Sequence, residues 1–302
     1  MKYLDFTISV LVCMMLISPG SLKSQDLLDI LEEETEPTSQ VVSATFKGTR
    51  IGNGHSVETR KQGVLEFLIS HRFGRINGGF YELFGLDESN IRFALEYAIS
   101  DRFTLGFGRS SFDKSFDGFA KYRLFQQKTG DNSFPVSITL LGSVAQKTLK
   151  DYPPGSKPDF DDRLAYTTQL LIARKFNSNL SLQFSPTYIH RNTVPRPDDP
   201  NDILALGFGG RMKITNHVAI NAEYYYTINP LESINPVNSL ALSVDIETGG
   251  HVFQLMISNA VAMIEKSFIT ETRDQFFQGD IHLGFNISRA FHLGKKNRRE
   301  SW

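Results

Sequence analysis

Twelve successive runs of this chain alternate between apolar residues and polar or small ones, and this alternation constrains the fold more than any other feature. Successive side chains of a β-strand point to opposite faces, so each run places its apolar residues on a single face. The runs begin at residues 64, 91, 103, 117, 136, 164, 180, 204, 218, 240, 252 and 280. Each is close to the ~9 to 11 residues that a tilted membrane-spanning strand needs. A dozen such runs without a competing helix predict one meandering antiparallel sheet.

The last run, Asp280–Phe291, shows the alternation most clearly. One face carries Ile281, Leu283, Phe285, Ile287 and Phe291, and Arg289 alone interrupts that face. A strand of this length with a terminal aromatic residue close to the C-terminus resembles the closing strand of outer-membrane barrels. The alternative is an ordinary amphipathic strand of a soluble, secreted β-sandwich.

The connections between the runs are of two kinds. Short ones span 100–102, 177–179, 215–217 and 248–250, and longer ones span 74–90, 111–116, 147–162, 192–202, 229–238 and 262–279. The connection 126–133 is intermediate and falls where a short turn belongs. Short periplasmic turns that alternate with longer outer loops are typical of outer-membrane barrels. We therefore expect an all-β fold: a single antiparallel transmembrane β-barrel of about twelve strands over residues 64–291, with both chain ends in the periplasm.

The start of the chain resembles a secretory signal peptide. Lys2 precedes an apolar run from Phe6 to Ile17, which is too short for a membrane helix, and the small residue Ser24 follows. We expect residues 1–24 to be removed and the mature protein to reside in the outer membrane of a Gram-negative bacterium. Cys13 is the only cysteine, so the mature chain would have no disulfide and no cysteine-bound metal.

Residues 25–63 lie between the signal peptide and the first run. The part up to residue 40 is an acidic leader without Lys or Arg, whereas Val41–Glu58 contains three glycines among charged side chains. We hypothesise that Val41–Glu58 folds into or against the periplasmic mouth of the barrel and limits passage, and an additional strand or a loose linker is the alternative. The contacts of this plug would be Lys47, Arg50, His55 and Glu58. After the barrel, residues 292–302 form a basic tail.

Several short segments, mostly in the first half of the chain, are similar to those of a known family. They read TFKGTR at 45–50, NGHSVE at 53–58, GFYELFGLD at 79–87, ISDR at 99–102, GRSS at 108–111 and DGF at 117–119. In these segments the chain resembles an uncharacterised family of outer-membrane β-barrels in Bacteroidota, the domain-of-unknown-function family 5777. The resemblance implies a fold and a location, and it carries no activity to transfer.

The face opposite the apolar one is expected to line the lumen, and many of its side chains are charged. The candidate lumen and solute-binding residues are Arg92, Glu96, Lys121, Arg123, Arg211, Lys213, Glu223, Asp245 and Glu247, accompanied by Glu66, Arg72, Asp117 and Lys175. One interpretation is a charged lumen that selects a polar solute, with Arg92, Lys121, Arg123 and Arg211 as an anion-attracting wall. The other is that opposite charges pair across neighbouring strands and fill a narrow interior.

The leading functional hypothesis is passage or binding of a small polar solute, as in a porin. The alternative is a non-conducting barrel that binds a partner, and a membrane-embedded lipid hydrolase using Ser185 with His190, or Ser288 with His282, is a third reading. Because no motif fixes either pair, we expect no enzyme activity, no cofactor and no metal. The formal net charge of −1 argues against nucleic acid. The expected partners are outer-membrane lipid, a small polar solute or a periplasmic protein.

Overall fold

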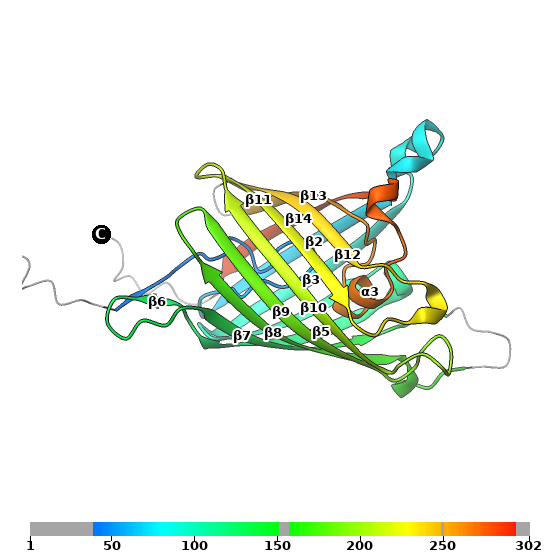
Figure 1. Ribbon diagram of the computed structural model, residues 1–302, viewed down its shortest axis with the longest axis horizontal. Helices are drawn as coiled ribbons and strands as arrows, with labels where there is room; N and C mark the ends of the chain where they lie inside the picture. Colours follow the sequence, from blue (N-terminus) through cyan, green and yellow to red (C-terminus); the bar gives the residue numbers. More distant parts are fainter. Residues whose placement is uncertain (1–38, 151–156, 249–250, 294–302) are drawn as a thin grey trace, which may run out of the picture. The chain divides into compact units, whose positions relative to one another are not determined.

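A computed structural model describes residues 39–150, 157–248 and 251–293 of the chain. Twelve antiparallel strands form a closed barrel in which chain neighbours are also sheet neighbours (Figure 1). The strands are β2 (Val64–Arg75), β3 (Ser89–Ser100), β4 (Phe103–Ser110), β5 (Phe116–Phe125), β7 (Ser137–Gln146), β8 (Leu164–Lys175), β9 (Leu180–Arg191), β10 (Asp202–Lys213), β11 (Val218–Thr227), β12 (Ser239–Thr248), β13 (His251–Ser258) and β14 (His282–His292). Two short strands, β1 (Gln40–Val41) and β6 (Lys128–Thr129), are not part of this sheet.

The barrel closes where the first strand pairs with the last. β14 runs antiparallel to β2, with Ile287 opposite Ile69 and Phe291 opposite Leu65. All twelve predicted runs are strands, so the barrel prediction is confirmed and the β-sandwich alternative is wrong. The largest boundary differences are about two residues: β3 and β10 begin two residues earlier than predicted, and β14 begins two residues later.

The two faces of the sheet differ as the alternation predicts. In β3, Phe93, Leu95 and Tyr97 point outward and are exposed, whereas Arg92 and Glu96 point inward and are buried. Five tyrosines on the outward face, Tyr122, Tyr166, Tyr188, Tyr224 and Tyr226, are 37–47% exposed. The Tyr188 hydroxyl donates to the Asp202 carboxylate at 2.6 Å, and the Asn238 amide donates to the Tyr224 hydroxyl at 2.8 Å. An outward tyrosine with a hydrogen-bonded hydroxyl suits the boundary between lipid and water.

The connections divide the barrel into a short-turn end and a long-loop end. The predicted short turns at 100–102, 177–179 and 215–217 are present, and the fourth includes residues 249–250, which lie outside the described residues. The long loops contain the short helices η1 (Ile76–Gly85), η2 (Phe112–Lys114), η3 (Asp161–Arg163), η4 (Glu232–Ile234), α3 (Glu265–Thr270) and η5 (Phe276–Gln278). None of the helices in the described ranges is long and apolar enough to cross a membrane.

Two segments that do not belong to the sheet fill the barrel interior. One, here called the inserted segment, comprises residues 45–58 and precedes β2, which starts at the short-turn end. The other, the inward loop, comprises residues 259–274 and leaves β13 at the long-loop end. All six residues of α3, which belongs to this loop, are buried. The predicted signal peptide, most of the acidic leader and most of the basic tail lie outside the described residues.

Candidate functional site

The inserted segment is held by side chains of the barrel wall. It has no strand partner, so its backbone groups must find other hydrogen bonds. The Gln254 and Asn286 amides donate to the carbonyl groups of Ile51 and Gly52 at 2.7 and 2.9 Å. The Glu223 carboxylate accepts the N–H groups of Asn53 and Gly54 at 2.6 and 3.0 Å. The polar inner face therefore serves as the hydrogen-bonding surface for this segment.

Apolar contacts hold the same segment in place. Its residues Phe46, Ile51 and Val57 form one buried cluster with wall residues Phe119, Leu141, Leu171 and Ala173. On β10, a side chain at Gly209 would collide with Ile51, so the glycine there leaves the room that this segment needs. These apolar contacts depart from the expectation of a polar inner face. Inward Phe119, Leu141 and Leu171, in otherwise polar inner registers, were the signal that could have revealed them.

The predicted contact residues of the inserted segment all meet the wall or the inward loop. Lys47 pairs with Glu247 at 2.6 Å, and the Glu58 carboxylate pairs with Arg123 at 3.2 Å. Arg50 pairs with Glu96 of β3 at 3.1 Å. The fourth predicted contact residue, His55, contacts the inward loop.

The predicted lumen residues lie on the inner face, and most of them contact this segment or one another. Lys121 donates to the carbonyl groups of Ser56 and Glu58 at 2.9 Å each. Arg92 forms a buried ion pair with Asp117, and the Asp245 carboxylate accepts from Gln254 at 2.7 Å. Lys213 instead contacts the turn that follows β10, where its Nζ lies 3.4 Å from the Asn216 side chain. Arg211 differs, since its Nε has no hydrogen-bond partner among the described residues.

The inserted segment and the inward loop meet inside the barrel. Glu265, the first residue of α3, lies 3.3 Å from the Arg50 guanidinium and 3.2 Å from His55 Nε2. We call Arg50, His55 and Glu265 the latch. All three are buried, with exposed fractions of 8, 1 and 3%. The latch is the direct ionic contact between the two segments that fill the interior.

The inward loop is anchored by an apolar surface on β9, β10 and β11. Phe268 and Ile269 of α3 pack in one buried cluster that includes Ile189, Ile203 and Tyr225 from the wall. The rings of Tyr225 and Phe268 meet edge to face at 5.2 Å between centroids. The sequence predicts an outer loop at residues 262–279, but the structure turns most of this segment into the barrel, where α3 is buried. Its signal was the apolar stretch from Ala260 to Ile264, which an exposed loop would not carry.

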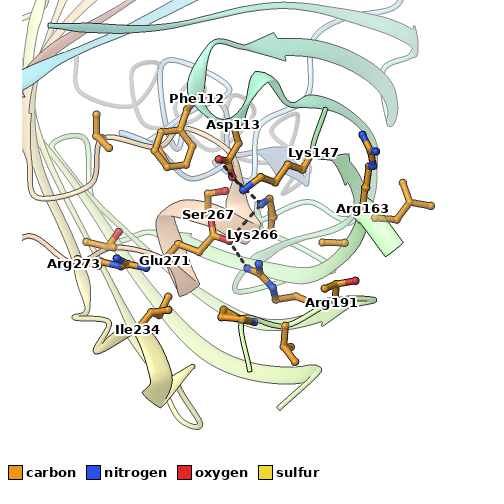
Figure 2. A pocket seen from close by; sticks show the side chains of 18 of the residues that line it. Phe112, Asp113, Lys147, Arg163, Arg191, Ile234, Lys266, Ser267, Glu271 and Arg273 are labelled. Atoms are coloured by element: carbon orange, nitrogen blue, oxygen red, sulfur yellow. Dashed lines mark hydrogen bonds and ion pairs between the residues drawn. The ribbon is translucent and has the colours of Figure 1, made fainter. Parts of the chain in front are cut away.

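At the long-loop end, Lys266 and Ser267 of α3 help to line a cavity of about 630 Å³, which we call the vestibule (Figure 2). Its charged lining residues are Arg75, Lys147, Arg163, Arg191, Lys266, Arg273, Asp113, Asp162, Glu271 and Asp274, and its apolar ones include Phe112, Val194, Ile234 and Ala262. Arg191 pairs with Glu271 at 2.7 Å, and Lys147 pairs with Asp113 at 3.1 Å. Burial favours the neutral form of Glu271, but Lys266 and Arg191 outweigh it and hold the pKa of this carboxyl well below its ordinary range.

The serine–histidine pairs of the hydrolase reading do not form. Ser185 points into the barrel, whereas His190 lies on the outward register, where it contacts Asp202 at 2.6 Å. Ser288 and His282 share the inner face of β14 but are six positions apart, roughly 20 Å along a strand. His282 instead contacts the Asp274 carboxylate at 2.6 Å. Within the described ranges, no group of three or more His, Cys, Asp or Glu side chains is arranged to hold a metal ion.

This chain is similar to known membrane β-barrels. Residues 46–291 match the model of a family described as a membrane bound beta barrel domain (DUF5777). No curated protein matches the chain significantly. Among solved structures, it is similar to the NanC porin, with a TM-score of 0.47 and 8% identity over 76% of this chain and 100% of that one. An outer membrane channel of Pseudomonas putida F1 gives a TM-score of 0.45 and 12% identity over 78% of this chain and 98% of that one.

Proposed function

This chain belongs to the membrane-bound β-barrel family (DUF5777), and we propose that it is an outer-membrane barrel that admits a small polar solute through a lumen closed at rest. One observation carries the proposal: two segments enter the interior from opposite ends and meet at the latch. A barrel kept only as a membrane anchor would need no such arrangement. The Bacteroidota origin implied by the resemblance stays a prediction.

The contacts of the inserted segment suit a closure that can move. The segment is attached by hydrogen bonds and ion pairs to side chains and by the apolar cluster of Phe46, Ile51 and Val57, rather than by a strand ladder. A neutral hydrogen bond of this kind contributes about 1 kcal/mol net, and one to the charged Glu223 about 1.5–3 kcal/mol, because water replaces each bond when the segment leaves. Withdrawal would hydrate Glu96, Lys121 and Glu223 and leave a water-filled, charge-lined path. We propose that these wall residues then contact the solute.

We propose that the short-turn end faces the periplasm, as short turns do in bacterial outer-membrane barrels. The inserted segment would then enter from the periplasm as a plug, and the vestibule would open to the outside. Solute would reach the vestibule first and the wall charges second.

Planar-bilayer conductance tests this proposal. The intact protein should show low conductance, and deletion of residues 41–58 should raise it while heat-dependent gel mobility confirms that the barrel is folded and inserted. A matched control is Lys114→Gln, a charge change in a long loop outside the vestibule, which should leave conductance at the intact level. Unchanged conductance in a correctly inserted deletion variant would contradict the plug. Failure to insert would instead show that the segment is needed to form the sheet.

A second candidate function is a non-conducting barrel that binds a partner. One observation favours it: the aromatic rings of Phe80 and Tyr81 in η1 and of Phe277 in η5 are 82, 94 and 92% exposed. Large exposed aromatic side chains are typical of interaction surfaces. A folded barrel that stays silent both with and without residues 41–58 would favour this function over passage.

A further inference from the structure

The vestibule carries more positive than negative charge, and three of its four carboxylates, Asp113, Glu271 and Asp274, already face cations. Six of its lining residues are cations and four are anions. Asp113 faces Lys147 and Lys266, while Asp274 faces Arg75 and His282. Arg273, by contrast, is exposed at the rim and forms no ion pair within the described ranges. The excess charge that remains to bind a ligand is therefore positive.

At the vestibule floor, Lys266 lacks a close partner. Its side chain is only 4% exposed, yet its Nζ lies 3.4 Å from Glu271 and 3.7 Å from Asp113. A charge-assisted hydrogen bond is typically about 2.7–2.9 Å long, so both contacts are loose. Beside it, the buried Nε of Arg191 has no hydrogen-bond partner in the described part of the chain. A buried ammonium with loose partners gains free energy from a closer anionic oxygen.

The residue before Lys266 is Glu265 of the latch. Both lie in the first turn of α3, where Lys266 lines the vestibule and Glu265 contacts Arg50 and His55 of the inserted segment. Since α3 is a single short helix, a shift of Lys266 toward a ligand also moves Glu265. The vestibule and the inserted segment are thereby linked through one element.

We propose that the vestibule binds a small organic anion, and that contact of the anion with Lys266 draws Glu265 away from Arg50 and releases the inserted segment. This deepens the function proposed above and rests on it, because it names the class of solute and the event that opens the barrel. By thermodynamic linkage, release of the inserted segment must in turn strengthen anion binding.

Accessibility of the inserted segment tests the proposal without measuring transport. Cys13 is the only native cysteine, so Ser56→Cys in a C13S chain offers one thiol, at a position that is fully buried. The reconstituted protein is treated with a membrane-impermeant maleimide alone and with succinate, succinamide or putrescine. These three probes share a four-carbon chain and differ in charge. Succinate should raise the labelling rate about fivefold or more, the lower end of typical coupling between two sites, and the other two should not.

Three variants test which residues the response to succinate depends on. Lys266→Gln should abolish the response to succinate, whereas Lys114→Gln, which removes a charge outside the vestibule, should retain it. Glu265→Gln should raise the labelling rate without any anion, because it weakens the latch directly. Equal responses to all three probes, no response to succinate, or a response that survives Lys266→Gln would each overturn the proposal.

The labelling experiment and the conductance experiment distinguish the anion site from solute passage. A saturable response to succinate in a barrel that never conducts would uphold the anion site and reject solute passage. Conductance that rises on deletion of residues 41–58, in a protein whose Ser56→Cys labelling ignores succinate, would uphold passage and reject the anion site.

Discussion

The Arg50 guanidinium lies 3.3 Å from the Glu265 carboxylate, although 215 positions separate the two residues in the chain. Arg50 also lies 3.1 Å from Glu96, so a single guanidinium connects the inserted segment, the inward loop and the barrel wall. A buried cation between two carboxylates is costly to remove, because both anions then lose their partner. The packing of the two interior segments against the barrel wall therefore depends strongly on this side chain.

Arg50→Ala should destabilise the barrel by about 3–5 kcal/mol, the usual effect of breaking a buried ion pair. The urea midpoint of unfolding in detergent micelles measures this change. Arg50→Lys keeps the charge and should recover part of the loss. The Arg50→Ala/Glu265→Gln double variant should lose less than the sum of the single variants, and strict additivity would show that the two side chains do not interact.

Glu223→Gln should loosen the inserted segment without disturbing the sheet. The carboxylate accepts two backbone N–H groups from Asn53 and Gly54, and hydrogen bonds to a charged group contribute about 1.5–3 kcal/mol each. Hydrogen exchange should accelerate at Asn53 and Gly54 but not in β11, which carries Glu223. Equal acceleration in β11 would indicate general destabilisation instead.

Phe268→Ala should release the inward loop. Phe268 is fully buried against Tyr225, and removal of a buried aromatic ring costs about 3–5 kcal/mol. Trypsin should then cleave after Lys266, which the intact protein protects. Arg273 provides the internal control, since it is exposed and should be cleaved in both proteins. Protection of Lys266 in the variant would mean that other contacts suffice to hold α3.

Phe93→Trp should report contact with lipid. Trp302 is the only tryptophan, so Phe93→Trp in a W302F chain has a single fluorophore on the outward face of β3. Its emission should be quenched by brominated lipids in reconstituted vesicles. Phe119→Trp, on the inner face of β5, is the matched control and should not be quenched. Quenching of the inner probe alone would contradict the membrane-spanning barrel.

Much of the fold could be predicted because alternation with period 2 is a local property. Phe93 and Leu95 face outward and Arg92 and Glu96 face inward whatever lies across the barrel. The rule that inward residues are polar was less reliable. It failed at Leu141 and Tyr225, because a lumen filled with protein forms an apolar core where a water-filled one would not.

The sequence by itself determined the strands, their order along the sheet and the face on which each charge lies. Only the tertiary structure decided what those charges meet. Glu223 accepts backbone N–H groups from a segment about 170 positions earlier, and Glu265 meets Arg50 across the lumen. Such contacts join residues that share no local pattern. They form because burying a charge without a partner costs more free energy than ordering a segment to pair with it.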